Sequence, residues 1–160
     1  MAPTTDATLR NILTEARSFA CVGMSADPIR PSHYVGAYLH RRGYRVISVN
    51  PSLVGRTLFG ETACASLPDV AGPVDVLDVF RRSEAVPGIV EEALRVLTGL
   101  RCVWLQIGVR SPEARAMCAE AGVDFVEDRC PKIEHQRLFG ELRKAGFATG
   151  IIGSKRPPLP

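Results

Sequence analysis

The segment from Gly23 to Ser32 combines residue types that bind a phosphate in nucleotide-binding proteins. Gly23 follows a short apolar run and permits close approach of the backbone to a ligand. Arg30 adds a fixed positive charge, and Ser32 stands at the expected N-cap of the next helix, whose first N–H groups favour an anion. The same pattern also fits a tight strand-to-helix turn in which Ser32 only caps the helix. The candidate ligand-binding residues of this segment are Gly23, Met24, Ser25, Arg30 and Ser32.

Other candidate ligand-binding residues also follow apolar runs. Two adjacent arginines at the end of a strand, Arg81 and Arg82, can hold a polyphosphate, and Val86 would form an apolar wall beside them. The alternative for this pair is a solvated loop with one ion pair, for example to Glu84. Gly108 again permits close backbone approach. The candidates outside the first segment are Asn50, Pro51, Phe80, Arg81, Arg82, Val86, Gln106, Gly108, Cys130 and Lys132.

These residues need a scaffold, and the chain predicts one by alternating short apolar runs with amphipathic segments. We expect strands at residues 19–22, 45–49, 74–80, 101–107 and 124–126, and helices at residues 6–17, 31–42, 83–97, 111–120 and 131 to about 144. Nearly continuous apolar strands that alternate with helices indicate a parallel sheet covered on both faces. The predicted fold is therefore α/β, a Rossmann-like doubly wound five-stranded parallel sheet with its ligand crevice at the carboxyl ends of the strands.

Length and composition favour one globular domain. The chain has 160 residues, of which 46% are hydrophobic and 23% charged, which is ordinary for a single domain. We expect a core over about residues 18–138 and a tail at 147–160 that is rich in Gly and Pro. The net charge of +3 is not gathered in a basic stripe, so we expect no nucleic-acid partner.

Neither a membrane span nor a secretory signal is predicted. No apolar run reaches the length of a transmembrane helix, and the first residues lack the profile of a signal peptide. The five cysteines include no C-x-x-C pair and have no histidine at metal-ligand spacing. We therefore expect a cytoplasmic protein with reduced thiols and no metal site.

The glycine pattern disfavours a nicotinamide dinucleotide. Gly23 is followed by a longer, proline-stiffened loop instead of G-x-G-x-x-G. After the second predicted strand stands Asn50, where an acid would bind the ribose hydroxyls.

Five motifs together carry a family resemblance. They are Val22-Gly23-Met24-Ser25 with Arg30-Pro31-Ser32, Val49-Asn50-Pro51, Asp78-Val79-Phe80-Arg81-Arg82, Val103-Trp104-Leu105-Gln106, and Asp128-Arg129-Cys130-Pro131-Lys132-Ile133-Glu134. Over roughly residues 18–138 the chain resembles the stand-alone CoA-binding domain proteins, which are similar to the N-terminal domain of the succinyl-CoA synthetase α subunit.

This resemblance implies coenzyme A as the ligand. By resemblance, the loop Gly23 to Ser32 with Arg30 would hold the phosphates, and Asn50 and Pro51 would lie by the adenosine. Phe80, Arg81 and Arg82 would flank the nucleotide together with Val86. We expect no counterpart of the second synthetase domain, which carries a phosphorylated histidine, and His135 matches nothing in that mechanism.

The leading hypothesis is a binding module for CoA or a CoA thioester, without evident catalytic residues. One alternative is an enzyme acting on a CoA thioester, for which Cys130, His135 and Asp128 are the candidate groups. The other is an NAD(P)-binding redox sensor. A monomer and a two-fold homodimer are both compatible with the sequence.

Cys130 supports a further hypothesis. Arg129, Lys132 and a helix that begins at Pro131 surround it, and positive charge at a helix N-terminus lowers a thiol pKa. Such a thiol would form a mixed disulfide with bound CoA under oxidising conditions. The alternative is a small buried side chain that fixes the turn.

Overall fold

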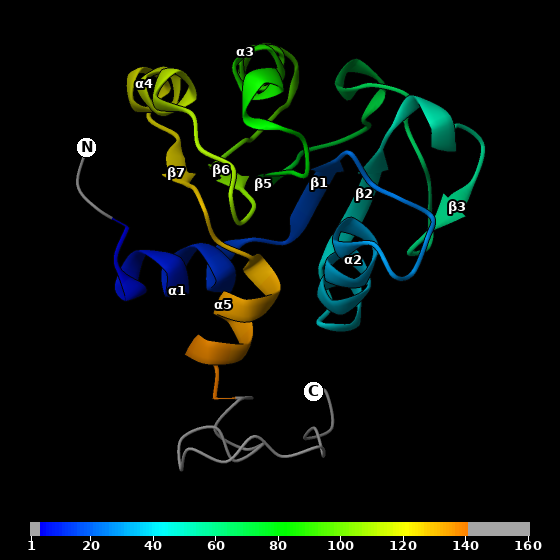
Figure 1. The fold of residues 1–160 in the computed structure, drawn as a ribbon, viewed down its shortest axis with the longest axis horizontal. Helices are drawn as coiled ribbons and strands as arrows, with labels where there is room; N and C mark the ends of the chain where they lie inside the picture. Colours follow the sequence, from blue (N-terminus) through cyan, green and yellow to red (C-terminus); the bar gives the residue numbers. More distant parts are fainter. Residues whose placement is uncertain (1–3, 141–160) are drawn as a thin grey trace.

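A five-stranded parallel sheet forms the centre of the molecule (Figure 1). The computed structural model of the chain describes residues 4–140. The strands are β1 (Ser18–Val22), β2 (Arg45–Val49), β5 (Val76–Val79), β6 (Cys102–Leu105) and β7 (Asp124–Val126), arranged in the order β2-β1-β5-β6-β7. Every neighbouring pair is parallel. The predicted doubly wound parallel sheet is confirmed.

Helices cover both faces of the sheet (Figure 1). One face carries α1 (Asp6–Glu15), α2 (Pro31–Arg41) and α5 (Pro131–Leu138), and the other carries α3 (Val86–Val96) and α4 (Pro112–Ala121). Each face has its own hydrophobic core, so the strands are buried on both sides. This double burial explains why the strands are nearly continuous in apolar residues.

Local signals set the helix boundaries. Thr5 caps α1 by accepting a hydrogen bond from the Thr8 amide, and Ser111 caps α4 in the same way from Ala114. Gly122 follows α4 in the left-handed conformation that ends many helices. Proline occupies the first turn of α2, α3, α4 and α5, where no amide donor is needed.

The predicted layout differs from the structure in several places. A hairpin of β3 (Thr57–Leu58) and β4 (Glu61–Thr62) lies beside β2 and was not predicted. The helix predicted from residue 83 begins with a separate short 3-10 turn, η3 (Ser83–Ala85). The last helix ends at Leu138, and Gly140 has a φ of 78°. The tail predicted for residues 147–160 lies outside the described residues.

None of the described helices has the length and apolar content that crossing a bilayer requires.

Candidate ligand-binding site

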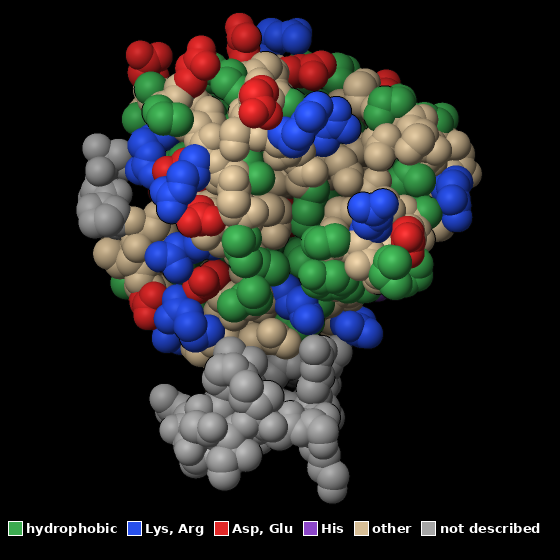
Figure 2. Space-filling view, viewed as in Figure 1, with side chains coloured by type: hydrophobic (Ala, Val, Ile, Leu, Met, Phe, Trp, Pro, Cys, Tyr) green, Lys and Arg blue, Asp and Glu red, His purple; other side chains and the backbone are tan. Residues whose placement is uncertain are grey.

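A cavity of about 850 Å³ opens at the carboxyl ends of the strands. It lies between the neighbouring strands β1 and β5. Here the order in which strands are added to the sheet reverses, because β2 lies on one side of β1 and β5 on the other. Open α/β sheets bind ligands at this point. The face of Figure 2 carries intermingled basic and acidic side chains around a central run of hydrophobic ones. The cavity is lined by Gly23, Met24, Ser25, Ala26, Asp27, Arg30, Pro31, Ser32, Asn50, Ser52, Leu53, Phe80, Arg81, Arg82, Ser83, Glu84, Gln106, Ile107, Gly108 and Val109.

Gly23 brings the end of β1 against the end of β5. Its φ is 88°, a backbone conformation that residues with a Cβ atom rarely adopt. A Cβ atom at this position would lie 3.0 Å from the carbonyl oxygen of Phe80 and 3.0 Å from Cδ of Arg81. Glycine is therefore required here both for its conformation and for the close contact between the two strand ends.

The loop between β1 and α2 is stabilised by its own side chains. Ser32 Oγ accepts a hydrogen bond from the Ser25 amide at 2.9 Å, and Ser25 Oγ accepts one from the Asp27 amide at 3.1 Å. Asp27 Oδ1 in turn accepts from the Ile29 amide at 3.1 Å. The expectation that Ser32 is the N-cap of α2 is wrong. Because Pro31 begins the helix, Arg30 takes the N-cap position, and the Ser32 hydroxyl holds the loop instead.

Asn50 joins the end of β2 to this loop. Its Nδ2 donates to the carbonyl oxygen of Met24 at 2.9 Å. Its Oδ1 accepts from the amide and from the hydroxyl of Ser52, each at 3.0 Å. Both ends of the amide therefore have protein partners, although Asn50 also lines the cavity. Its contacts make it a residue that holds the loop in position.

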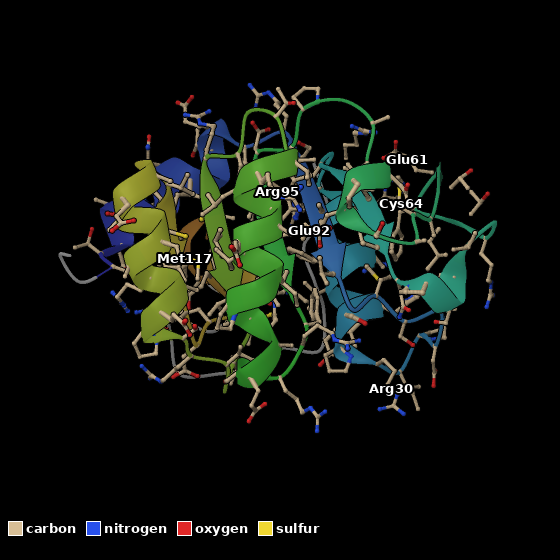
Figure 3. All side chains as sticks on the ribbon, turned by 90° about the horizontal axis from the view of Figure 1, so that it is seen from above. Arg30, Glu61, Cys64, Glu92, Arg95 and Met117 are labelled. Carbon is tan, nitrogen blue, oxygen red and sulfur yellow. The ribbon has the colours of Figure 1, made fainter. Side chains whose placement is uncertain are left out.

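Three arginines provide positive charge around the cavity. Arg30, Arg81 and Arg82 are exposed, and among the described residues none of them forms an ion pair. Figure 3 shows the Arg30 side chain extending from the edge of the molecule. The alternative in which Glu84 pairs with an arginine is therefore not what the structure contains, and three guanidinium groups are available to an anionic ligand.

A buried carboxyl group lies behind Gln106. Asp78, on the central strand β5, is fully buried, and its Oδ1 accepts a 2.8 Å hydrogen bond from Nε2 of Gln106. Its Oδ2 has no partner in the described part of the chain. Burial raises the pKa of Asp78 to about 7, against the lowering effect of the Gln106 hydrogen bond. The sequence signal for this group was a single acid within an otherwise apolar strand.

Four predicted site residues lie outside the cavity. Val86 is fully buried in the core between the sheet and α3, so it cannot form an accessible apolar wall. Pro51 lines a separate space of about 270 Å³ that shares Gly23, Asn50 and Arg81 with the main cavity. Lys132 lies with its Nζ 5.4 Å from the centre of the Tyr34 ring. The fourth residue, Cys130, is buried.

The Cys130 thiol does not have the expected low pKa. Burial raises its pKa and outweighs the lowering contacts with the backbone amides of Ile133 and Lys132. This correction favours the alternative in which Cys130 is a small buried side chain at the start of α5. A raised pKa also lowers the fraction of thiolate, which is the form that would react in a mixed disulfide with CoA.

The other two groups considered for catalysis have structural partners. Asp128 Oδ1 accepts from the Gly108 amide at 2.7 Å, and its Oδ2 accepts from Arg110 at 2.6 Å. The Tyr38 hydroxyl and Nδ1 of His135 are 2.9 Å apart. Neither Asp128 nor His135 is among the residues that line the cavity. Residues 4–140 also contain no cluster of three or more His, Cys, Asp or Glu side chains suited to a metal ion.

Sequence reasoning missed several residues of the cavity wall. Ser52, Leu53, Ser83 and Val109 follow predicted strands within a few residues, and Ile107 is the last residue of one, so their chain positions were a usable signal. Acidic Asp27 and Glu84 also lie on the wall and reduce the net positive charge there.

Comparison with known proteins places the chain in a family. The family model described as a CoA binding domain matches residues 17–136. The uncharacterized protein YneT of Bacillus subtilis is 38% identical over 129 residues, which cover 81% of this chain and 93% of that protein.

Two solved structures are similar over most of the chain. The Thermus thermophilus protein called cell-free ID.343 is 47% identical, with a TM-score of 0.80 over 85% of this chain and 100% of that one. A hypothetical protein from Pyrococcus horikoshii is 34% identical, with a TM-score of 0.78 over 88% of this chain and 100% of that one. On this match and on the fold described above, the chain belongs to the CoA binding domain family.

Proposed function

We propose that this protein binds coenzyme A, or a CoA thioester, in the cavity at the carboxyl ends of β1 and β5. The observation that carries the proposal is the cavity itself, which brings together the Gly23 turn, the start of α2 and three arginines that form no ion pair within residues 4–140. Phosphate groups favour guanidinium groups and the N-termini of helices. Membership of the CoA binding domain family supports the same ligand.

The cavity also suits the size and mixed polarity of the ligand. Its volume of about 850 Å³ falls within the range of small-molecule sites. Phe80, Leu53 and Val109 provide apolar wall beside the arginines. CoA has the matching composition, because it joins a charged nucleotide to a less polar pantetheine arm.

Thermal denaturation with a ligand panel tests this proposal. We expect CoA and acetyl-CoA to raise the unfolding midpoint in a concentration-dependent way, because a ligand that binds only the native state stabilises it. NAD and NADP at the same concentrations should raise it little. Competitive titration then decides between the ligands: displacement of CoA by NAD at comparable concentration would overturn the assignment in favour of the nicotinamide alternative.

A further inference from the structure

The Gln106 amide is held by Asp78 in one orientation. Nε2 of Gln106 donates to Asp78 Oδ1 at 2.8 Å. The other amide atom, Oε1, accepts no hydrogen bond from a described residue. Among the described residues, the fully buried side-chain atoms without a partner are Ser48 Oγ and Asp78 Oδ2, so Oε1 is not fully buried. Gln106 lines the cavity. Its amide therefore has the nitrogen turned toward the core and the oxygen accessible to a ligand.

From this geometry we propose that Asp78 is a positioning residue that makes Gln106 present a hydrogen-bond acceptor to the ligand, and so selects a ligand group that donates. The proposal rests on the proposed function. The pantetheine arm of CoA has suitable donors in its amide N–H groups and its terminal S–H. The nucleotide half of CoA lies on the other side of the diphosphate and does not need this contact.

Proton binding by Asp78 changes the orientation that it favours. An ionised carboxylate only accepts hydrogen bonds, so it holds Nε2 inward. A protonated carboxyl group also donates, and it can then bond to Oε1 of a rotated Gln106 amide, which turns Nε2 toward the ligand. Burial that raises the pKa of Asp78 to about 7 brings this change into the physiological range. The acceptor facing the cavity is therefore present at higher pH and is partly lost at lower pH.

Among residues 4–140, burial and the Gln106 hydrogen bond are the causes of the shift in the Asp78 pKa, and no charged side chain contributes to it. Its neighbours in the sheet are Cys21 on β1 and Trp104 on β6, and α1 contributes apolar side chains to the same core. On α2 and α5, Tyr38 and His135 are hydrogen-bonded to each other. The titratable groups whose pKa values Asp78 influences are the thiols of Cys21, Cys102 and Cys130, all of which burial holds in the neutral form.

Calorimetric titration of wild-type protein and Asp78→Asn with CoA tests the proposal. The asparagine has nearly the same shape but stays neutral, so it allows both amide orientations at every pH. We expect it to bind CoA about three- to tenfold more weakly than wild type at about pH 8, the effect of one hydrogen bond. The two proteins should converge at about pH 5.5. Because both titrations use the same ligand, ionisation of the CoA phosphates cancels in the comparison.

A second ligand separates this effect from a general change in the cavity. Phosphoadenosine diphosphate, the nucleotide half of CoA without its pantetheine arm, should bind wild type and Asp78→Asn equally at both pH values. Gln106→Met keeps Asp78 and removes the amide. In this variant the affinity for CoA should depend on pH no more than the affinity for phosphoadenosine diphosphate does. If Asp78→Asn does not fold, the comparison of wild type with Gln106→Met still tests the proposal. The additional pH dependence that CoA binding shows over phosphoadenosine diphosphate binding in wild type must be absent from Gln106→Met.

Nuclear magnetic resonance gives a readout that does not depend on ligand. The side-chain amide resonances of Gln106 should shift with a midpoint near neutral pH in wild type and stay constant in Asp78→Asn. Equal CoA affinity of wild type and both variants across pH would overturn the role of Asp78 while leaving the proposed function intact. Failure of CoA to bind wild type at any pH would overturn both.

Discussion

Nδ2 of Asn50 donates a 2.9 Å hydrogen bond to the carbonyl oxygen of Met24, which joins the end of β2 to the loop after β1. Since Asn50 Oδ1 also accepts from the Ser52 amide and hydroxyl, one side chain links two loops at the cavity. An amide is well suited to this position, because it donates at one end and accepts at the other.

Asn50→Ala tests this link. We expect the free energy of unfolding to fall by about 1–3 kcal/mol, the range for loss of hydrogen bonds around a partly buried group. CoA affinity should also fall, because the loop is no longer held. The control is Ser52→Ala, which removes only the hydroxyl contact and should have a smaller effect. Urea denaturation and calorimetry measure both quantities, and equal stability of the two variants would show that the Met24 contact contributes nothing.

Gly23→Ala should be more damaging than the matched Gly43→Ala. Both residues have a positive φ, 88° and 93°, so both substitutions introduce backbone strain of about 1–2 kcal/mol. Gly43 has no atom within 4 Å of the added Cβ, whereas at Gly23 the added atom meets Phe80 and Arg81 at 3.0 Å. Thermal denaturation should therefore give the larger loss for Gly23→Ala, together with weaker CoA binding. Similar losses would mean that the contact at the strand ends relaxes easily.

Arg30→Ala should weaken CoA binding by about 1.5–3 kcal/mol, the scale of a hydrogen bond to a charged group. Arg95→Ala is the control, since Arg95 is exposed on α3 and lies away from Arg30 in Figure 3. Calorimetry should show normal affinity for the control and unchanged folding for both. Normal affinity of Arg30→Ala would remove this residue from the site.

Asp78 should make the protein less stable as the pH rises. Its pKa in the folded state, about 7, lies above the value near 3.9 of an unfolded aspartate. The contribution of this residue to the free energy of unfolding is therefore complete below about pH 4. It decreases by about 1.4 kcal/mol per pH unit as the pH rises, and it levels off above about pH 7. Urea denaturation between about pH 5 and 8 should show this slope in wild type and a smaller one in Asp78→Asn. Parallel slopes would contradict the raised pKa.

Thiol labelling should distinguish Cys64 from the other cysteines. Cys64 is partly exposed, whereas Cys21, Cys102, Cys118 and Cys130 are buried. We expect one fast-reacting thiol in the folded protein, lost in Cys64→Ser, and five after denaturation. Fast labelling at Cys130, shown by its loss in Cys130→Ser, would restore the hypothesis of a reactive thiol there.

The sequence was most informative about the sheet and the turns at its carboxyl edge. Parallel strands buried on both faces leave long apolar runs, and the glycine after β1 marks a real steric requirement. The hairpin β3–β4 was missed because strands of two residues are too short to show alternation.

Side-chain direction was the main source of error within the site. Val86 is close in sequence to residues of the cavity wall, but its side chain lies in the core. Lys132 lies in the first turn of α5, and its side chain packs over the ring of Tyr34. The importance of Asp78 was also hidden, because the hydrogen bond that links it to Gln106 joins residues 28 positions apart.

Trp104 is the one tryptophan of the chain, and it is the strand neighbour of Asp78. Its ring is fully buried, with Nε1 donating to the Arg129 carbonyl oxygen at 2.9 Å. All tryptophan fluorescence of the protein therefore comes from one fixed indole beside the buried carboxyl group. A charge that forms on Asp78 changes the electric field across this indole, so the emission wavelength reports the protonation of that carboxyl group without any added label.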